Sequence, residues 1–308
     1  MNKFFNLIVF FFFIIVCFLL FKTLSQIQWE IVAQGLSKFS LFILLQALLL
    51  VFIDYAILSS FDLMGMRYLK IKTLSSFKVL ISAFSCYVFN LNLGALVGGM
   101  GFRFKIYSGW GVSKSNISKV VLFSSFTNWL GHAFLLSTVF CFQNESVATL
   151  FDLPSWLFYL IGIFQYIMIL IYLYFSMKRK KIVFKKSEWI FPRLRLAFFQ
   201  MIISSFQWVT LSLIIYILIK FLGHNIGFGK ILFTSLVASI AGVLTHIPGG
   251  LGVLETIYLK VNLGIPKEDL LAALISYRFV YYLFPLFTAI PCYLGIEYYQ
   301  RKGPRITI

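Results

Sequence analysis

The sequence predicts an all-α integral membrane protein, and three observations lead there. Of its 308 residues, 60% are hydrophobic and only 12% are charged, against roughly 25% charged in an average soluble domain. The mean hydropathy is +0.92, and apolar runs of about 20 residues, the length of a membrane-spanning helix, recur along the chain. These runs lack the alternation of barrel strands, so helices must satisfy their backbone hydrogen bonds. A soluble globular protein is excluded as a class.

Eight apolar segments can be marked from one end of the chain to the other. They cover residues 4–21, 39–60, 79–101, 118–142, 155–177, 195–222, 229–262 and 269–298. The first segment is similar in composition to a signal peptide. No small-residue cleavage site follows it, so we expect it to remain as a span.

The distribution of Lys and Arg predicts which ends of the segments face the cytoplasm. The connection 178–195 carries eight cations and is therefore expected inside. Segment 79–101 has a basic connection on both sides, so both of its ends are expected inside. Segment 195–222 is expected to run outward and the basic C-terminal tail to lie inside, so both ends of segment 229–262 are expected outside. This arrangement puts 20 of the 27 Lys and Arg inside, six outside and Arg278 within the membrane, with both termini cytoplasmic.

Glycines interrupt these two unusual segments at matching positions. The first segment contains Gly98 and Gly99, and the second contains Gly249 and Gly250, 151 residues later. Two broken segments that enter from opposite faces are typical of inverted-repeat transporters with a site near the membrane midplane. We therefore predict one membrane domain, residues 1–308, of six transmembrane helices and two re-entrant hairpins. Its half-repeats are expected at about 39–142 and 195–298.

Charged residues inside apolar segments are candidate site residues, because burying a charge in hydrocarbon is costly. Asp54 lies in the middle of its segment with no cation within one helical turn. The alternatives to a site role are a structural tertiary pair or a protonated acid. Arg278 lies about nine residues, or about 14 Å of helix, beyond Asp269 and is too deep to reach the membrane surface easily. Both residues are expected to line a polar path.

Arg103 and Glu255 each follow a glycine motif. A half-helix that begins at such a break offers free backbone N–H groups and a positive dipole end, to which an anion can bind. The alternative is a salt bridge between Arg103 and Glu255 that joins the two hairpins. The sequence leaves both possibilities open.

Histidines and cysteines give weaker signals. His246 directly precedes the Pro-Gly-Gly break and is a further site candidate because unwound backbone surrounds it, whereas His132 is expected to be a packing residue. Neither the three histidines nor the four cysteines have the spacing of metal ligands, so no metal or other cofactor is expected.

The net charge of +17 could indicate a nucleic-acid-binding protein. That function needs a basic face on a folded aqueous domain, and none is predicted here, so no nucleic-acid partner is expected. Orientation explains the basic connection 178–195, with contact to anionic lipid as an additional role. No Walker motif is present, so direct coupling to ATP is not expected.

Three stretches, GALVGGMGFRFKIYSGWGVS, THIPGGLGVLETIYL and ALISYRFVYYLFPLFTAI, together resemble motifs of the lysylphosphatidylglycerol synthase transmembrane family. That family includes the flippase region of multiple peptide resistance factors, and the resemblance runs from about Asp54 to the last segment. It implies a bacterial inner-membrane protein that moves aminoacylated or related phospholipid between leaflets, with Asp54, Arg103 and Glu255 linked to translocation. The sequence ends at Ile308, without a soluble synthase domain after the last segment, so synthase activity is not expected.

The leading interpretation is a phospholipid flippase or scramblase. In it the lipid phosphate would meet Arg103, Arg278 and the glycine-rich helix ends, and a cationic head group would meet Asp54 and Glu255. The first alternative is a membrane enzyme acting on lipid-linked substrates, with one of these acids as general base. The second is a non-catalytic partner subunit of an envelope lipid enzyme. Association into a homodimer is also considered.

Overall fold

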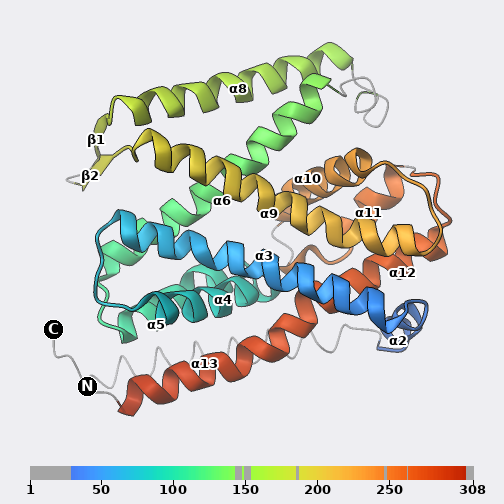
Figure 1. Cartoon of the computed structure of the whole chain (residues 1–308), viewed down its shortest axis with the longest axis horizontal. Coiled ribbons are helices and arrows are strands. Elements are labelled where there is room, and N and C mark those ends of the chain that lie inside the picture. The colour runs from blue at the N-terminus through green and yellow to red at the C-terminus, as the bar shows by residue number, and fades with distance from the viewer. Residues whose placement is uncertain are drawn as a thin grey trace.

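The computed structural model describes residues 29–142, 148, 154–184, 187–245, 248–261 and 263–302. These residues form a bundle of helices with one short two-stranded hairpin (Figure 1). Within the described ranges, seven helices are long and apolar enough to cross a membrane. The predicted all-α membrane class is therefore confirmed. The first apolar segment, residues 4–21, lies outside the described residues.

The elements follow the marked segments, with shifted ends in several places. In chain order they are α2 (Trp29–Ser37), α3 (Leu41–Tyr68), α4 (Ser76–Leu93), the π-helix η1 (Ala95–Gly101), α5 (Phe102–Gly109), α6 (Lys114–Phe142), α8 (Ser155–Met177), β1 (Lys181–Phe184), β2 (Ser187–Ile190), α9 (Leu194–Phe221), α10 (Phe228–Thr245), the 3-10 helix η2 (Pro248–Gly250), α11 (Val253–Lys260), α12 (Lys267–Arg278), the π-helix η3 (Phe279–Leu283) and α13 (Phe284–Lys302). The antiparallel pair β1–β2 lies in the basic connection and was not predicted.

Helix α3 shows how polar residues are placed in this bundle. Its Leu49 and Phe52 side chains are 60% and 73% exposed on the outer surface, whereas Asp54 and Asp62 are completely buried. Apolar side chains on the outside suit contact with lipid, because hydrocarbon does not penalise them. The inner face of a spanning helix is therefore free to carry the polar residues of a site.

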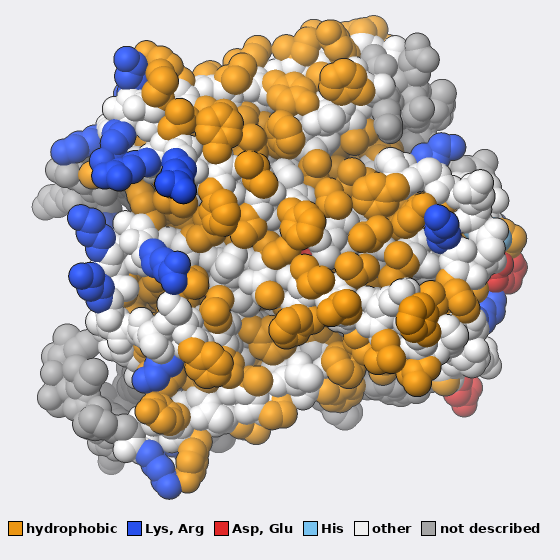
Figure 2. All heavy atoms as spheres, viewed as in Figure 1, with side chains coloured by type: hydrophobic (Ala, Val, Ile, Leu, Met, Phe, Trp, Pro, Cys, Tyr) orange, Lys and Arg blue, Asp and Glu red, His pale blue; other side chains and the backbone are white. Residues whose placement is uncertain are grey.

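Lys and Arg side chains are concentrated at one end of the molecule, while fewer of them lie at the other end beside acidic side chains (Figure 2). The view in Figure 2 is mostly hydrophobic across its middle, and Lys and Arg cluster at the end where the α3–α4 and α8–α9 connections lie. Exposed cations at this end include Arg67 in the last turn of α3, Lys70 after α3, and Lys178 to Lys180 after α8. The two connections expected on the same side of the membrane thus lie at the same end of the bundle.

The first hairpin consists of α4, η1 and α5. Helix α4 ends at Leu93, and Gly94, with φ of +82°, reverses the chain so that η1 and α5 return along α4. The expectation that Gly98 and Gly99 break the helix is wrong, since both lie inside the helical turns of η1. A Cβ atom on Gly98 would lie 1.9 Å from the carbonyl oxygen of Phe89. This glycine therefore allows the two arms to pack closely.

The second hairpin consists of α10, η2 and α11, and here the glycines do break the helix. Gly249, Gly250 and Gly252 all have positive φ angles, of 64°, 56° and 78°, which glycine adopts without steric cost. In Figure 1 this hairpin occupies the half of the molecule opposite to α4 and α5. The two tips approach each other, because a Cβ atom on Gly249 would lie 3.6 Å from the carbonyl oxygen of Leu91.

We predict that Gly98→Ala destabilises the protein by about 1–3 kcal/mol, because the added methyl group forces α4 and η1 apart. The measurement is the thermal unfolding midpoint of the purified variant in detergent. The matched control is Gly295→Ala in α13, where an added Cβ meets no atom of the described residues within 4 Å. Equal midpoints for both variants and the unmodified protein would contradict the close packing of the first hairpin.

Candidate functional site

Each hairpin is held by one pair of an arginine and a carboxylate. In the first hairpin, Arg103 of α5 donates from Nε to Oδ2 of Asp62 at 2.9 Å and from a terminal nitrogen to Oδ1 at 3.2 Å. Such a bidentate pair combines charge attraction with fixed geometry. The other terminal nitrogen of Arg103 donates to the carbonyl oxygen of Gly99 at 3.1 Å, and the Tyr107 hydroxyl donates to Asp62 at 2.8 Å. The pair therefore ties α5 and η1 to α3.

The Arg103–Asp62 pair is closed to the surroundings. The two side chains are 6% and 0% exposed, and the guanidinium carbon lies 4.3 Å from the ring centre of Tyr87. Arg103 is not at the start of a half-helix as expected, because η1 continues directly into α5. The alternative of a salt bridge between Arg103 and Glu255 is also wrong, since each has a different partner.

The second pair joins Arg278, at the end of α12, to Glu255, in the first turn of α11. Arg278 donates from Nε to one carboxylate oxygen and from a terminal nitrogen to the other at 2.8 Å. Its terminal nitrogens also donate to the carbonyl oxygens of Gly249 and Gly250, both at 2.8 Å. Four residues singled out in the sequence are thus brought together. Arg278 satisfies backbone groups that the broken helix leaves free.

The Arg278–Glu255 pair is more accessible than the first pair. Its side chains are 14% and 17% exposed, and Gly249 and Gly250 beside it are partly exposed. The ring centre of Tyr282 lies 5.5 Å from the guanidinium carbon of Arg278, a distance at which an aromatic face attracts a cation. Of the two pairs, this one is the more exposed in the observed conformation.

Asp54 lies between three elements at the centre of the bundle. Its side chain is fully buried and accepts hydrogen bonds from Nε2 of Gln207 in α9 at 3.0 Å and from the hydroxyl of Tyr281 in η3 at 2.7 Å. The hydroxyl of Tyr55 donates to the carbonyl oxygen of Tyr281 at 3.0 Å. No cation in the described ranges forms an ion pair with Asp54. Its described hydrogen-bond partners are neutral.

The structure also shows site residues that the sequence analysis missed. Asp62 lies just beyond the marked segment 39–60 and was not considered as a buried charge, although α3 continues to Tyr68. Gln207 was also missed, although a long polar side chain within an apolar segment could have indicated it. Tyr281 carried no signal, because tyrosine is common in such helices.

The two histidines considered above have different outcomes. His246 lies outside the described residues. Nε2 of His132 lies 3.0 Å from the carbonyl oxygen of Leu236 and 2.9 Å from Oγ of Ser239, and the side chain is 3% exposed. The expectation that His132 is a packing residue is confirmed.

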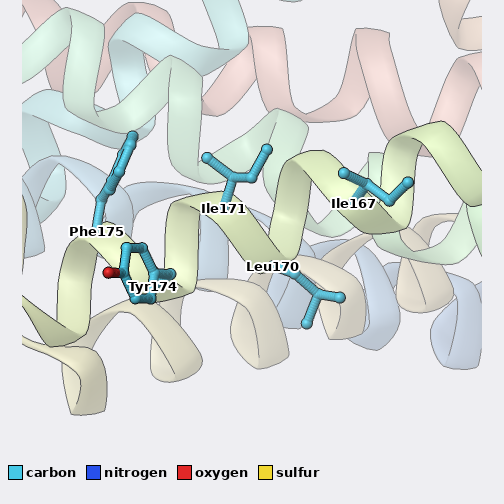
Figure 3. A pocket seen from close by; sticks show the side chains of 5 residues that line it. All are labelled: Ile167, Leu170, Ile171, Tyr174 and Phe175. Atoms are coloured by element: carbon cyan, nitrogen blue, oxygen red, sulfur yellow. The ribbon is translucent and has the colours of Figure 1, made fainter.

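An apolar groove on α8 is separate from these polar clusters. Figure 3 shows five side chains around it, all from this one helix. They are Ile167, Leu170, Ile171, Tyr174 and Phe175. Several of them are exposed on the outer surface of the bundle, so lipid chains can cover this groove without any specific ligand.

Comparison with known proteins gives consistent matches along the chain. The family model described as "Lysylphosphatidylglycerol synthase TM region" matches residues 6–289. The inner membrane protein YbhN of Escherichia coli is 34% identical over 295 residues, which cover 94% of this chain and 92% of YbhN. The Synechocystis protein slr0712 is 30% identical over 84% of this chain and 81% of its own length.

Longer relatives match over part of their length. The phosphatidylglycerol lysyltransferase of Staphylococcus haemolyticus is 24% identical over 289 residues. These residues cover 90% of this chain but only 32% of the lysyltransferase. The chain therefore spans about a third of that enzyme.

The unequal burial of the two pairs predicts unequal effects on stability. Asp62→Asn leaves Arg103 buried without its countercharge and is expected to cost about 3–5 kcal/mol. Glu255→Gln is expected to cost clearly less, because water can reach Arg278. The measurement is the unfolding midpoint of both acid-to-amide variants in the same detergent. A larger loss for Glu255→Gln would contradict the conclusion that Arg103–Asp62 is the more deeply buried of the two pairs.

Proposed function

The chain belongs to the lysylphosphatidylglycerol synthase transmembrane family and is a multi-pass protein of the bacterial inner membrane, and we propose that it moves an aminoacylated or related phospholipid between leaflets. The observation that carries this proposal is the accessible Arg278–Glu255 pair at the tip of a glycine-broken hairpin. A charged pair among apolar helices marks a path for a polar group, because burying unused charge is costly.

The proposed topology is an inverted repeat in which the two hairpins enter the membrane from opposite faces. Helices α3 and α9 both have 28 residues, and α4 and α10 both have 18. Asp54 lies 13 residues after the start of α3, Gln207 lies 13 residues after the start of α9, and the two side chains are hydrogen-bonded. Contact between matching positions is expected near a pseudo-two-fold axis.

The orientation follows from the charged connections. The connections after α3 and after α8 carry many of the Lys and Arg residues and lie at one end of the bundle (Figure 1). The positive-inside rule places that end in the cytoplasm, and both termini are proposed to lie on the same side. The first hairpin then enters from the cytoplasm and the second from the outer face.

The second hairpin is proposed to bind the lipid head group by exchange of partners. A phosphate can replace Glu255 beside Arg278, and an amine can replace Arg278 beside Glu255 and the ring of Tyr282. Because the pair is neutral as a whole, a head group with both charges leaves neither protein charge unpaired. The acyl chains stay in the lipid, and only the head group passes the hairpin tips.

The first hairpin is proposed to perform the same exchange on the cytoplasmic side. In the observed conformation Arg103 and Asp62 are closed on each other. When the bundle opens toward the cytoplasm, Arg103 meets the lipid phosphate while Arg278 and Glu255 close. The head group would thereby be passed from one charged pair to the other across the midplane.

The longer relatives support this choice of substrate. Their name, phosphatidylglycerol lysyltransferase, describes the addition of lysine to phosphatidylglycerol, which gives a head group with a phosphate and amines. These are the two charges that an arginine–carboxylate pair can bind. The proposal for this chain is therefore a phospholipid whose head group carries both.

Purified protein in liposomes tests the function directly. Exchange of labelled aminoacylated phospholipid between leaflets, with no covalent change, is the expected result. Formation of a new lipid product would instead favour a membrane enzyme. Inactivity until a second envelope protein is added would favour a partner subunit.

We predict that Arg278→Gln lowers the rate of lipid exchange by at least about tenfold, the effect of losing roughly 1.4 kcal/mol of charge-assisted binding. The assay is dithionite quenching of a fluorescent amine-bearing phospholipid in proteoliposomes. The matched control, Arg301→Gln, removes an arginine that is 77% exposed and pairs with Glu297 on α13; it should exchange lipid at the unmodified rate. Unchanged exchange in Arg278→Gln would remove this pair from the mechanism.

A second prediction tests the topology. In a cysteine-less background, single cysteines at Ser76 and Ser113, the exposed positions flanking the first hairpin, should both react with a membrane-impermeant reagent from the cytoplasmic side. Labelling from opposite sides would mean that α4 crosses the membrane completely, and the re-entrant topology would be wrong.

A further inference from the structure

Asp54 differs from the other two core acids, Asp62 and Glu255, in the chemistry of its partners. Those two are each bound by two nitrogens of an arginine. An arginine only donates hydrogen bonds and carries a fixed charge, so it favours the ionised carboxylate. The partners of Asp54 are an amide and a hydroxyl, and each of these groups can either donate or accept. The surroundings of Asp54 therefore suit both the carboxylate and the carboxylic acid.

The amide of Gln207 has an unused acceptor beside this acid. Its Nε2 donates to Asp54, while its Oε1 is buried and has no hydrogen-bond partner within the described part of the chain. Half a turn of the amide presents Oε1 to Asp54, so that a protonated Asp54 can donate to it. One end of the amide is satisfied by Asp54 in either state. The hydroxyl of Tyr281 can likewise turn from donor to acceptor.

Among the residues that the structure describes, no charged group contacts Asp54 and holds it in one state. The titratable side chains beside it are tyrosines: Tyr281 of η3 donates to Asp54, Tyr55 of α3 donates to the backbone of Tyr281, and Tyr277 of α12 stacks on the Tyr281 ring. Cys86 and Tyr87 of α4 instead face Arg103 and Asp62. From α9 the contact is the neutral Gln207. A bare carboxylate in this interior is costly, so uptake of a proton relieves a real penalty.

We propose that Asp54 is a proton-binding site that couples lipid movement to proton movement. This inference rests on the proposed transport function and adds a co-substrate to it. A proton enters when the bundle opens to one face, neutralises Asp54, and leaves when the bundle opens to the other.

The structure contains a connection from Asp54 to the head-group site. Tyr281, which donates to Asp54, lies in the π-helix η3, three residues after Arg278. π-Helical turns are strained segments that often occur at functional sites. The hydroxyl of Tyr55 holds the backbone of the same turn. A change of hydrogen bonding at Asp54 therefore acts on the helical turn that positions Arg278 against Glu255.

Infrared difference spectroscopy of the reconstituted protein tests the proton site without any transport assay. The expected result is a carboxylic-acid carbonyl band that appears reversibly as the pH falls and is missing in Asp54→Asn. Asp269→Asn, which changes a partly exposed acid paired with Lys38, should keep the band. A component that is lost in Asp54→Asn but present at every pH, or the absence of any such component, would overturn the proposal.

Two further variants test the proton site independently, in case Asp54→Asn does not fold. Asp54→Glu should retain a titrating band. Tyr281→Phe removes a donor to the carboxylate and should move the midpoint of the band to higher pH by about one unit. An unmoved midpoint in Tyr281→Phe would contradict the role given to this hydroxyl.

Liposomes with an imposed pH gradient test the coupling. Reversing the gradient should change the rate of lipid exchange at least about fivefold in the unmodified protein and leave Asp54→Asn unaffected, with equal results in sodium and potassium buffers. A titrating band with no lipid exchange would keep the proton site and reject the transport function. Lipid exchange that ignores the gradient would reject the coupling, and a dependence on sodium would replace the proton by that cation.

Discussion

A charge inside the hydrocarbon region needs a partner, and this requirement explains how the interior of the protein is built. The outer surfaces of the helices are apolar, and the polar side chains point inward, as Leu49 and Asp54 of α3 illustrate. Arg103 is neutralised by Asp62 and Arg278 by Glu255. The same two arginines also bind carbonyl oxygens of the glycine segments. The arginines that are paired with buried carboxylates therefore also hold the glycine segments of the two hairpins.

The two pairs differ in exposure, and this difference distinguishes the two hairpins in the observed conformation. The side chains of Arg103 and Asp62 are buried against each other, whereas those of Arg278 and Glu255 are partly exposed. In the proposed mechanism the observed conformation is therefore one of two, with the outer site open. Asp54 and Gln207 are hydrogen-bonded to each other where α3 and α9 meet. A change at that point can favour one conformation over the other, because both halves of the proposed repeat contact it.

The sequence predicted the membrane class, most helix positions and the second break, because hydropathy and the strain of positive φ at Gly249 are local properties. It also selected Arg278 and Glu255, since a buried charge is conspicuous. The position of the first break was predicted wrongly, because nothing local distinguishes Gly94 from Gly98. In the structure Gly94 reverses the chain, whereas Gly98 lies inside η1 and packs against Phe89. The partner of Arg103 was missed for a related reason: pairing with Asp62 is a tertiary contact across 41 residues.

The most direct test of the central claim, that a lipid head group exchanges partners with an arginine–carboxylate pair, is a cryo-electron microscopy map of the protein in nanodiscs containing an amine-bearing phospholipid. The proposed mechanism predicts head-group density between Arg278 and Glu255, with the phosphate beside the guanidinium and the two side chains separated. An intact Arg278–Glu255 pair, with ordered lipid only on the outer surfaces of the helices, would contradict it.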